Sequence, residues 1–352
     1  MSATRLIDRQ PLNHAAAWLP SDFPSPDAYA VDLSEAQAGA LVDGARAALE
    51  AGQEIERVDP KSVVFRGLDS LIEQWREKIL YGQGFLYLRG LPVDLPDAEY
   101  EAIFWGLGGR FGTAVSQSNM GDLLGHVVDV GGDDFRERAY RNRRELSMHT
   151  DRCDVVGMMC LQQAKSGGLS SYASALSVYN HVVSTRPELV EPLVRGFYYH
   201  RFGEQAESEP GVTQDRVPII SAEQGEVSIV YLRAYIEMAA KENDDPLTDL
   251  EREALDYFDD LCNSDEFKLT MMLQRGDIIF FNNCAMVHKR TAFEDHDDPA
   301  LRRHLLRLWL MAPDRPVTPA LARYKGHGIA AKSDANTYYK GDALVTPEQY
   351  RR

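Results

Sequence analysis

The chain has 352 residues, of which 44% are hydrophobic and 26% are charged, an ordinary globular composition with enough length for a large core. The formal net charge of -16 disfavours nucleic-acid and anionic-membrane partners, because an acidic surface repels phosphate groups. Charged residues interrupt every hydrophobic run and residues 1–18 lack the apolar core of a secretory signal, so we expect no membrane span and a cytoplasmic location.

The first part of the chain predicts helices around one early strand. Residues 1–33 are rich in Pro, Asp and Ser and predict an irregular arm. A helical pattern begins at Ser34, and Gln37 lies three residues further on, where it completes a capping box. The next predicted elements are a helix over 69–81, a strand over 84–94 and a helix over 96–108.

Beyond residue 110 the chain consists of short apolar runs separated by turn signals, and runs of this length predict strands rather than helices. These runs lie at 126–130, 155–164, 217–221, 227–233, 268–273, 277–283 and 304–311. Two helical insertions interrupt the series, one over about 175–195 and one over 247–262. The second insertion begins with Thr248 and Glu251 in a capping-box pattern.

Early helices followed by many short strands favour a fold that is mainly β with flanking helices, a β-sandwich or jelly roll rather than alternating βαβ units. No nucleotide-binding pattern such as GxGxxG follows a strand. We expect an N-terminal arm and helices over 1–80, a core domain over 81–315 with helical insertions, and a C-terminal extension over 316–352. The cysteines show no zinc-type spacing and are expected to be reduced, mostly buried thiols; they are Cys153, Cys160, Cys262 and Cys284.

The segment from Glu145 to Asp151 carries the sharpest local pattern, the pair His149 and Asp151. In an extended chain, residues two apart point to the same side, so the imidazole and the carboxylate lie next to each other. A third ligand from a distant strand completes the two-histidine, one-carboxylate triad that suits Fe(II). His288 is the candidate, because it follows an apolar strand and a polar turn. For the pair alone, the alternative is an ordinary Asp–His contact in a surface loop.

The other histidines have simpler interpretations. His296 lies in an acidic loop, His126 begins an apolar strand as a core histidine would, and His200 belongs to an aromatic run. His304 falls on the strand face opposite to the arginines that flank it.

Two arginines, Arg303 and Arg307, follow His288 in a segment that predicts a strand, where they share one face with Leu305 and Trp309. Arginines that point into an apolar sheet are costly unless each meets an anion. A two-point fork from Arg303 suits the distal carboxylate of an oxo-diacid whose keto-acid end chelates the metal. Arg307 is left for a substrate carboxylate or sulfonate, or for the chelating end of the same molecule. Pairing of both arginines with Asp or Glu of the chain is an equally open alternative.

Taken in order along the chain, these motifs resemble the taurine dioxygenase-like (TauD/TfdA) family of Fe(II)/2-oxoglutarate-dependent dioxygenases, over about residues 80–312. The segments that carry the resemblance are GFLYLRGLP at 84–92, HTD at 149–151, SGGLSS at 166–171, GDIIFFNN at 276–283 before His288, and RRHLLR at 302–307. The resemblance implies a double-stranded β-helix core, bound Fe(II), and 2-oxoglutarate and O2 as co-substrates. It also implies a reaction that hydroxylates or desaturates an unactivated C–H bond and releases succinate and CO2.

The resemblance also implies roles for single residues. The implied iron ligands are His149, Asp151 and His288. Ser170 and Arg303 take the positions that hold the distal carboxylate of 2-oxoglutarate, although Ser170 is also a plausible turn residue after two glycines. Arg307 matches an arginine that contacts a substrate anion in taurine-type members. The carboxylate of Asp151 favours hydroxylation or desaturation, since related halogenases carry a small residue there.

Substrate contacts are predicted from position. Arg152 stands where taurine-type members carry a small apolar residue, and the loop after His288 is longer and more acidic than usual, so taurine itself is not expected. Asn119 in SQSNMG and Arg233 in VYLRAYI are further candidates, with packing as the alternative for Arg233. Six arginines from 136 to 152 form either an anion-attracting mouth or a solvated loop. With Arg307, these residues favour a small anionic or zwitterionic substrate.

Two other functions fit part of the pattern. A zinc-dependent jelly-roll hydrolase or isomerase uses the same three ligands but leaves Ser170 and Arg303 without a purpose. A non-catalytic jelly-roll binding module leaves the complete triad unused. The sequence leaves the oligomeric state open, and a homo-oligomer is compatible with it.

Overall fold

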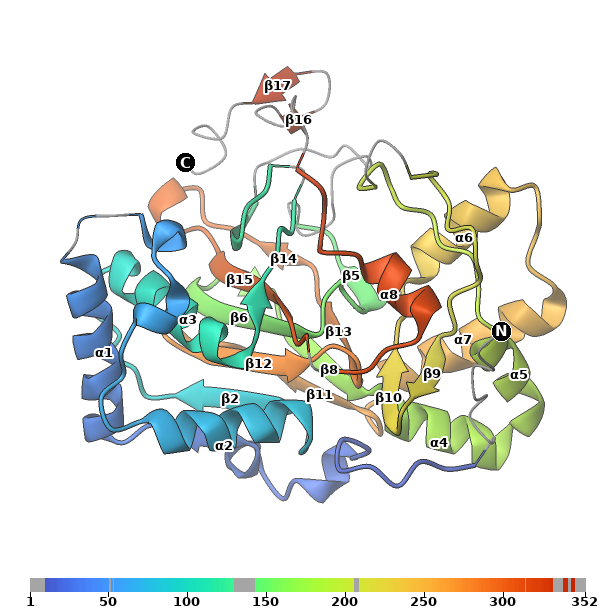
Figure 1. Cartoon of the computed structure of the whole chain (residues 1–352), viewed down its shortest axis with the longest axis horizontal. Coiled ribbons are helices and arrows are strands. Elements are labelled where there is room, and N and C mark those ends of the chain that lie inside the picture. Colours follow the sequence, from blue (N-terminus) through green and yellow to red (C-terminus); the bar gives the residue numbers. More distant parts are fainter. Residues whose placement is uncertain are drawn as a thin grey trace.

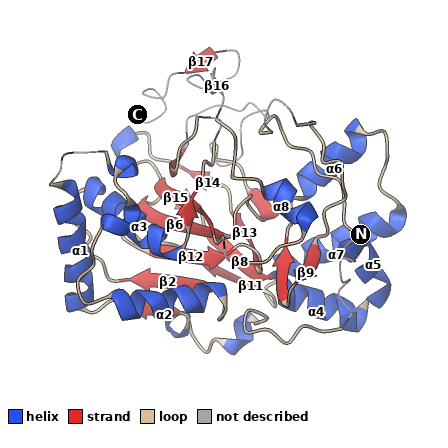
Figure 2. Cartoon of the chain, viewed as in Figure 1, coloured by secondary structure: helices blue, strands red, loops and turns tan. Residues whose placement is uncertain are grey.

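The computed structural model describes residues 10–50, 52, 54–118, 120–129, 143–205, 209–313, 315–331, 338–340 and 343–345. Two β-sheets form the centre of the molecule and helices flank them on both sides (Figures 1 and 2). This arrangement is the expected fold class, mainly β with flanking helices.

The larger sheet has the strand order β1-β2-β12-β6-β15-β3, with β4 also paired to β15. Its strands are β1 (Ala30–Asp32), β2 (Phe85–Arg89), β3 (Thr113–Ala114), β4 (Leu124–Val128), β6 (Val155–Gln162), β12 (Ile278–Asn282) and β15 (His304–Met311). All pairs in this sheet are antiparallel except β1 with β2, which is parallel. The predicted N-terminal arm therefore contributes the edge strand β1.

The second sheet, with the order β11-β8-β13-β5, carries two of the predicted metal ligands. Its strands are β5 (Leu146–His149), β8 (Ser170–Ser174), β11 (Lys268–Met271) and β13 (Met286–Arg290). Among the described residues, three two-stranded antiparallel sheets lie outside these two: β7 (Ser166–Gly167) with β14 (Phe293–Glu294), β9 (Ile220–Glu223) with β10 (Glu226–Ile229), and β16 (Tyr338–Lys340) with β17 (Ala343–Val345).

Side-chain alternation along the larger sheet divides the core into two layers. In β12, Ile279 and Phe281 face the second sheet, whereas Ile278 and Phe280 belong to the layer under the helices. All four side chains are buried, because both faces of this strand are covered. Double coverage is the reason that these strands read as continuous apolar runs in the sequence.

Helices cover the two sheets from opposite sides. The helices are α1 (Glu35–Leu49), α2 (Asp69–Leu80), α3 (Asp97–Phe111), α4 (Ala175–Thr185), α5 (Val190–Arg195), α6 (Arg233–Glu242), α7 (Asp249–Asn263) and α8 (Pro319–Lys325). Short 3-10 helices lie at Pro20–Asp22, Pro26–Ala28, Ile55–Arg57, Pro60–Ser62, Pro187–Leu189 and Pro299–Leu301. α2 and α3 pack on the larger sheet, and α4 and α7 pack on the second (Figure 1).

The predicted capping boxes are both present. Ser34 accepts from the Gln37 amide at the start of α1, and Thr248 accepts from the Glu251 amide at the start of α7. In each box the longer side chain accepts in return from the cap residue's own amide.

Several predicted bounds differ from the observed ones, as for β2, β9 and α3, and two predicted elements differ in type or continuity. The run 227–233 was expected to be one strand, but β10 ends at Ile229 and Arg233 begins α6. The helical insertion over 175–195 is interrupted at Pro187, which cannot continue α4 and opens a 3-10 turn before α5. The division at residues 80 and 315 stays a prediction.

No helix within the described ranges is long and apolar enough to cross a membrane. The cytoplasmic location stays a prediction.

Candidate metal centre

The second sheet brings His149 and His288 face to face. His149 is the last residue of β5, and antiparallel pairing places it directly opposite His288 of β13. Asp151 lies two residues beyond the end of β5. Residues distant in sequence therefore become neighbours through strand register.

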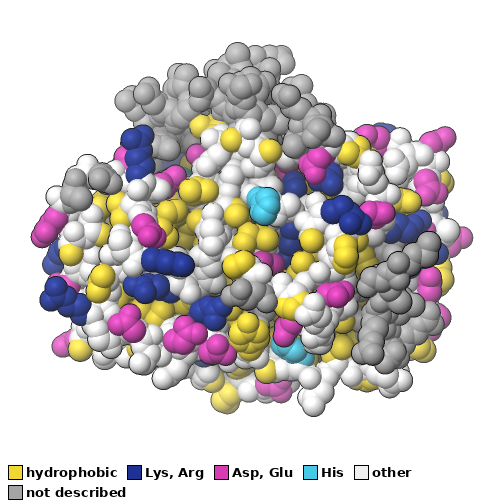
Figure 3. Space-filling view, in the orientation of Figure 1, with side chains coloured by type: hydrophobic (Ala, Val, Ile, Leu, Met, Phe, Trp, Pro, Cys, Tyr) yellow, Lys and Arg dark blue, Asp and Glu magenta, His cyan; other side chains and the backbone are white. Residues whose placement is uncertain are grey.

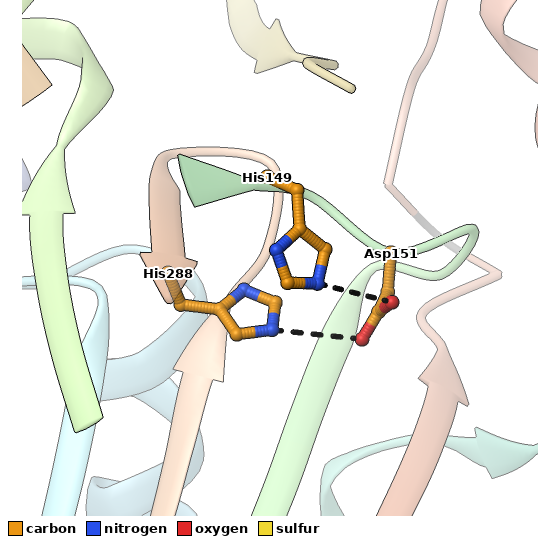
Figure 4. A group of neighbouring side chains, drawn as sticks. All are labelled: His149, Asp151 and His288. Carbon is orange, nitrogen blue, oxygen red and sulfur yellow. Dashed lines mark ion pairs between the residues drawn. The ribbon is translucent and has the colours of Figure 1, made fainter. Parts of the chain in front are cut away.

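The three side chains converge on one point (Figure 4). His149 Nε2 lies 3.8 Å from Asp151 Oδ1, and His288 Nε2 lies 3.7 Å from Asp151 Oδ2. One potential ligand atom from each residue lies within 4.8 Å of the others. These separations exceed hydrogen-bond length but suit atoms that each bind a common metal at about 2.0–2.2 Å.

The hydrogen bonding of His149 prepares it to bind a metal. Its Nδ1 lies 2.8 Å from the Ser147 carbonyl oxygen, which can only accept. The ring hydrogen therefore resides on Nδ1, and Nε2 presents a lone pair toward Asp151. Burial, with a further contribution from His149, lowers the pKa of His288 to about 3, so this imidazole is also neutral at physiological pH.

Trp309 and Asn283 hold Asp151 in position. Trp309 Nε1 donates to Asp151 Oδ2 over 2.9 Å. Asn283 Oδ1 accepts from the Asp151 amide at 3.0 Å, and Asn283 Nδ2 donates to the carbonyls of Asp151 and Cys153 at 2.8 and 2.7 Å. This buried network fixes the carboxylate before any metal binds.

A small cavity of about 50 Å³ adjoins the two histidines. Its walls are partly apolar, and arginines converge on it, which is the usual make-up of a site for a small anionic ligand. The lining residues are Val127, Leu146, His149, Met158, Ser170, Tyr172, His288, Lys289, Arg290, Arg303 and Arg307. Ser170, Arg303 and Arg307, three residues singled out from the sequence, thus lie in one cavity with two of the predicted metal ligands.

Arg303 lies at the end of this cavity next to the Gly167-Gly168 turn. Its side chain is 4% exposed and covers the ring of Phe293 at 5.1 Å, and burial lowers its pKa to about 10. Within the described parts of the chain, no carboxylate forms an ion pair with its guanidinium. A Cβ on Gly168 would lie 3.2 Å from Arg303 Nε, so the glycine allows the arginine to approach.

Arg307 lies on the metal side of the cavity. Its guanidinium covers the ring of Trp309 at 5.0 Å, and Trp309 in turn holds Asp151. Arg307 Nε donates to Gln117 Oε1 over 2.6 Å. Leu305, Arg307 and Trp309 share one strand face as predicted, although a bulge separates His304 from Leu305.

Arg290 is a candidate that the sequence reasoning missed. It lines the cavity, pairs across the strands with Ser170, and covers the same Phe293 ring as Arg303, at 4.7 Å. Burial and then the nearby charge of Arg303 lower its pKa to about 9. The sequence contained a pattern that could have identified this residue, because Arg290 lies two residues after His288 and therefore on the same face of β13.

The contacts of Arg152 and Arg233 do not support the predicted substrate roles. Arg152 is buried, and its guanidinium donates to the carbonyls of Tyr324 and Lys325 in the C-terminal segment. Arg233 forms ion pairs with Glu237, Asp256 and Asp259, at 2.8, 2.6 and 3.2 Å. Arg152 Nη1 lies 3.9 Å from Glu204 Oε2. Neither arginine lines the cavity.

Other candidates lie elsewhere or outside the described residues. Asn119 lies outside the described residues, and so do Arg136, Arg138 and Arg141 of the arginine cluster. Arg143 pairs with Asp129 at 2.9 Å. His126 Nδ1 lies 2.8 Å from His304 Nε2, and His200 pairs with Glu242, so these histidines have partners in the chain as expected.

The residues present fit Fe(II). Two imidazoles and one carboxylate form the set that would leave coordination positions open for a keto acid and O2 on bound Fe(II), and arginines lie in the adjoining cavity for the acid's charge.

Residues 46–309 match the family described as taurine catabolism dioxygenase TauD, TfdA family. The chain belongs to this family. Membership confirms the resemblance found in the sequence and makes the protein an Fe(II)/2-oxoglutarate-dependent dioxygenase.

Two relatives align with this TauD/TfdA-family chain over most of their length. FR-33289 synthase from Streptomyces rubellomurinus is 28% identical over 311 residues, which cover 86% of this chain and 91% of that protein. A taurine hydroxylase-like protein from Stachybotrys chartarum is 26% identical over 311 residues, which cover 84% of this chain and 79% of that protein.

Solved structures confirm the double-stranded β-helix fold. Asparagine oxygenase, in complex with Fe(II), 2S,3S-3-hydroxyasparagine and succinate, superposes with a TM-score of 0.66 at 20% identity and covers 86% of this chain and 100% of its own. The non-heme iron oxygenase OrfP, in complex with Fe and alpha-ketoglutaric acid, gives a TM-score of 0.62 at 16% identity and covers 86% and 100%.

Proposed function

We propose that this TauD/TfdA-family dioxygenase hydroxylates an unactivated C–H bond of a small molecule that carries an anionic group, with His149, Asp151 and His288 as iron ligands. The observation that carries the proposal is the single cavity that joins the two histidines to three buried arginines. The hydroxyamino acids in the complexes of asparagine oxygenase and OrfP agree with a small, charged substrate.

We assign the distal carboxylate of 2-oxoglutarate to Arg303, Ser170 and Arg290. Arg303 and Arg290 cover the same Phe293 ring, and Ser170 is the cross-strand partner of Arg290, so three donors surround one end of the cavity. Burial destabilises the charged guanidinium of Arg303, as its lowered pKa shows. A bound carboxylate would stabilise that charge through ionic hydrogen bonds, so the anion should bind strongly there.

Arg307 is assigned to an anion nearer the metal. It contacts Trp309, which donates to Asp151, whereas Arg303 contacts Phe293 at the far end. The order metal, Arg307, Arg303 favours Arg303 as the distal arginine and leaves Arg307 for the substrate anion or the chelating end of 2-oxoglutarate.

Bound Fe(II) with 2-oxoglutarate supplies the oxygen chemistry, and the protein supplies position and exclusion of water. Ser147 and Trp309 orient His149 and Asp151, and the arginines fix the co-substrate. Apolar side chains such as Val127 and Met158 line the rest of the cavity and exclude water from it.

The decisive experiment is anaerobic addition of Fe(II) and then 2-oxoglutarate to the purified protein. We expect a visible metal-to-ligand charge-transfer band, which the His149→Ala variant lacks. His296→Ala is the matched control, because His296 lies outside the triad and the band should persist. Absence of the band, together with no succinate release in air, contradicts the proposal and favours a zinc enzyme or a binding module.

The substrate class is tested by a screen of small acids and amino acids for stimulated succinate release. The product mass distinguishes the reactions, since hydroxylation adds one oxygen atom and desaturation removes two hydrogen atoms.

Arg307→Leu tests the anion assignment. We expect a rise in the substrate's KM of roughly tenfold or more, the effect of losing a charge-assisted hydrogen bond, while the KM for 2-oxoglutarate changes little. Arg303→Leu should show the reverse pattern. If 2-oxoglutarate binding collapses in Arg307→Leu instead, the two assignments are exchanged.

A further inference from the structure

A buried cluster joins the C-terminal helix to the turn that precedes β13. Lys325 is the last residue of α8, Cys284 lies in the turn between β12 and β13, and Asp154 immediately precedes β6. Lys325 is 1% exposed, Asp154 4% and Cys284 0%. Lys325 Nζ lies 2.7 Å from Asp154 Oδ1 and 2.8 Å from Cys284 Sγ. None of the three lines the cavity of the metal centre.

Asp154 explains part of this cluster, because its Oδ1 pairs with Lys325 and accepts from Cys284 Sγ at 3.5 Å, but it does not explain the short distance between Lys325 Nζ and Cys284 Sγ. Asp154 neutralises the ammonium of Lys325, and its second oxygen accepts from the Ala312 amide. A buried lysine needs such a partner, but it does not need a sulfur atom at 2.8 Å. That separation lies in the range of about 2.7–3.2 Å typical of N–H···O bonds, and sulfur is larger than oxygen. The amine and the thiol are thus held closer than an ordinary contact between them requires.

The other cysteines lack this environment. Among the described contacts, Cys153 Sγ meets only a backbone carbonyl, and burial raises the pKa of the Cys153, Cys160 and Cys262 thiols. Cys284 is different because a lysine ammonium lies against its sulfur, at 2.8 Å. The chain therefore offers internal controls for any chemistry specific to Cys284.

We propose that Lys325 and Cys284 form a covalent N–O–S bridge when the protein meets dioxygen. One O2 is consumed, one of its oxygen atoms becomes the bridge and the other leaves as water. The N–O and O–S bonds form while the O–O, S–H and one N–H bond break. Nitrogen and sulfur each lose two electrons, and O2 takes up the four. The extra proton of the ammonium passes to Asp154, which already accepts a hydrogen bond from it.

The bridge would connect the C-terminal segment 315–331 with residues that support the metal centre. Cys284 follows Asn283, whose side chain holds the backbone of Asp151. Lys325 and its neighbour Tyr324 accept hydrogen bonds from Arg152, which follows Asp151 in the chain. Oxidation would therefore fasten α8 to the turn behind an iron ligand, and reduction would leave only the ion pair.

The test is mass spectrometry of the purified full-length protein, and it does not depend on enzyme activity. One sample is kept anaerobic with reductant, one is exposed to air and one to hydrogen peroxide, and each is digested without reduction. We expect a cross-linked peptide pair containing residues 284 and 325, heavier than the two peptides by one oxygen atom minus two hydrogen atoms. The pair should disappear after treatment with dithiothreitol.

Variants make the result specific. Cys284→Ser should lose the cross-link and Cys153→Ser should keep it. The thermal midpoint of the air-exposed wild type should exceed that of the reduced form, and this difference should vanish in Cys284→Ser. Cys284 recovered only as free thiol, or as sulfinic or sulfonic acid without a link to Lys325, overturns the proposal. Because the wild-type measurement is sufficient, a variant that fails to fold does not affect the outcome.

Discussion

At the scale of single residues, the proposed iron ligands depend on neighbours outside the triad. Trp309 donates to Asp151 Oδ2 and also forms the surface on which Arg307 lies. One side chain thus connects the proposed metal site with the proposed anion site, and its substitution should separate effects on the metal from effects on folding.

Trp309→Phe removes the hydrogen bond to Asp151 but keeps an aromatic ring. We expect Fe(II) affinity to fall by roughly 10- to 100-fold, as for other outer partners of metal ligands, measured by anaerobic metal titration. Trp105→Phe is the matched control, because its indole donates to the Val58 carbonyl among the helices. Equal losses in both variants would mean that Trp309 acts through stability alone.

Arg290→Met tests the residue that the sequence reasoning missed. We expect the KM for 2-oxoglutarate to rise about tenfold or more, since a charge-assisted hydrogen bond contributes ~1.5–3 kcal/mol. Arg302→Met is the control, because Arg302 donates to the loop carbonyls of His296 and Asp297 and does not line the cavity. An unchanged KM in Arg290→Met would remove Arg290 from the distal site.

At the scale of elements, strand register and one tight turn shape the site. The pairing of β13 with β5 sets His288 against His149, and its pairing with β8 sets Arg290 against Ser170. The Gly167-Gly168 turn before β8 then brings the chain against Arg303. Gly168 therefore has two effects. It adopts a positive φ that other residues adopt at a cost, and its missing side chain leaves room for Arg303.

Gly168→Ala tests these two effects of the turn. Gly168 has φ +73, and its new Cβ would meet Arg303 Nε at 3.2 Å, so we expect a loss of stability of ~1–2 kcal/mol and a higher KM for 2-oxoglutarate. Gly225→Ala is the control, because Gly225 has φ +92 with nothing within 4 Å. Gly225→Ala should lose stability without a change in KM. The same KM in both variants would contradict the close approach to Arg303.

At the scale of the whole molecule, charged side chains of both signs alternate over the surface that Figure 3 shows. Figure 3 shows acidic and basic side chains interspersed on one face, so the net charge of -16 does not form a single acidic patch there. In the interior, buried histidines lie near buried arginines, and the pKa values of His288 and His304 are lowered. Such lowered pKa values should make the free energy of unfolding depend on pH.

His304 should make acidification destabilising. Burial, and then His126, lowers its pKa from 6.5 to about 4. Between pH 6.5 and pH 4, His304 is protonated in the unfolded chain but neutral in the folded chain. Its contribution to the free energy of unfolding is therefore fully present above pH 6.5 and is lost as the pH falls toward 4. The loss is at most about 3 kcal/mol. Denaturant unfolding with a chelator present should show this slope reduced in His304→Gln but not in His296→Gln. An identical slope in His304→Gln would contradict the assignment.

The sequence by itself predicted the fold class and singled out the three residues that converge in the metal centre and the two arginines that line its cavity, because periodicity and motifs with fixed spacing mark them. HxD predicted two ligands since residues two apart share a strand face, and β15 has the predicted bounds 304–311 because its apolar run is long and both its faces are buried. Both capping boxes followed from residues three apart.

Only the tertiary structure decided which distant residues meet. The sequence counted Arg233 and Arg152 as substrate ligands, and these roles stay predictions. In the structure Arg233 pairs with carboxylates of α6 and α7, and Arg152 donates to carbonyls of the C-terminal segment. The contact of Lys325 with Cys284 was invisible in the sequence, since docking of α8 creates it. Arg290 could be placed on the strand face of His288, but its meeting with Ser170 depends on the pairing of β13 with β8. Periodicity fixes which way a side chain points, whereas its partner depends on chain segments that packing brings together.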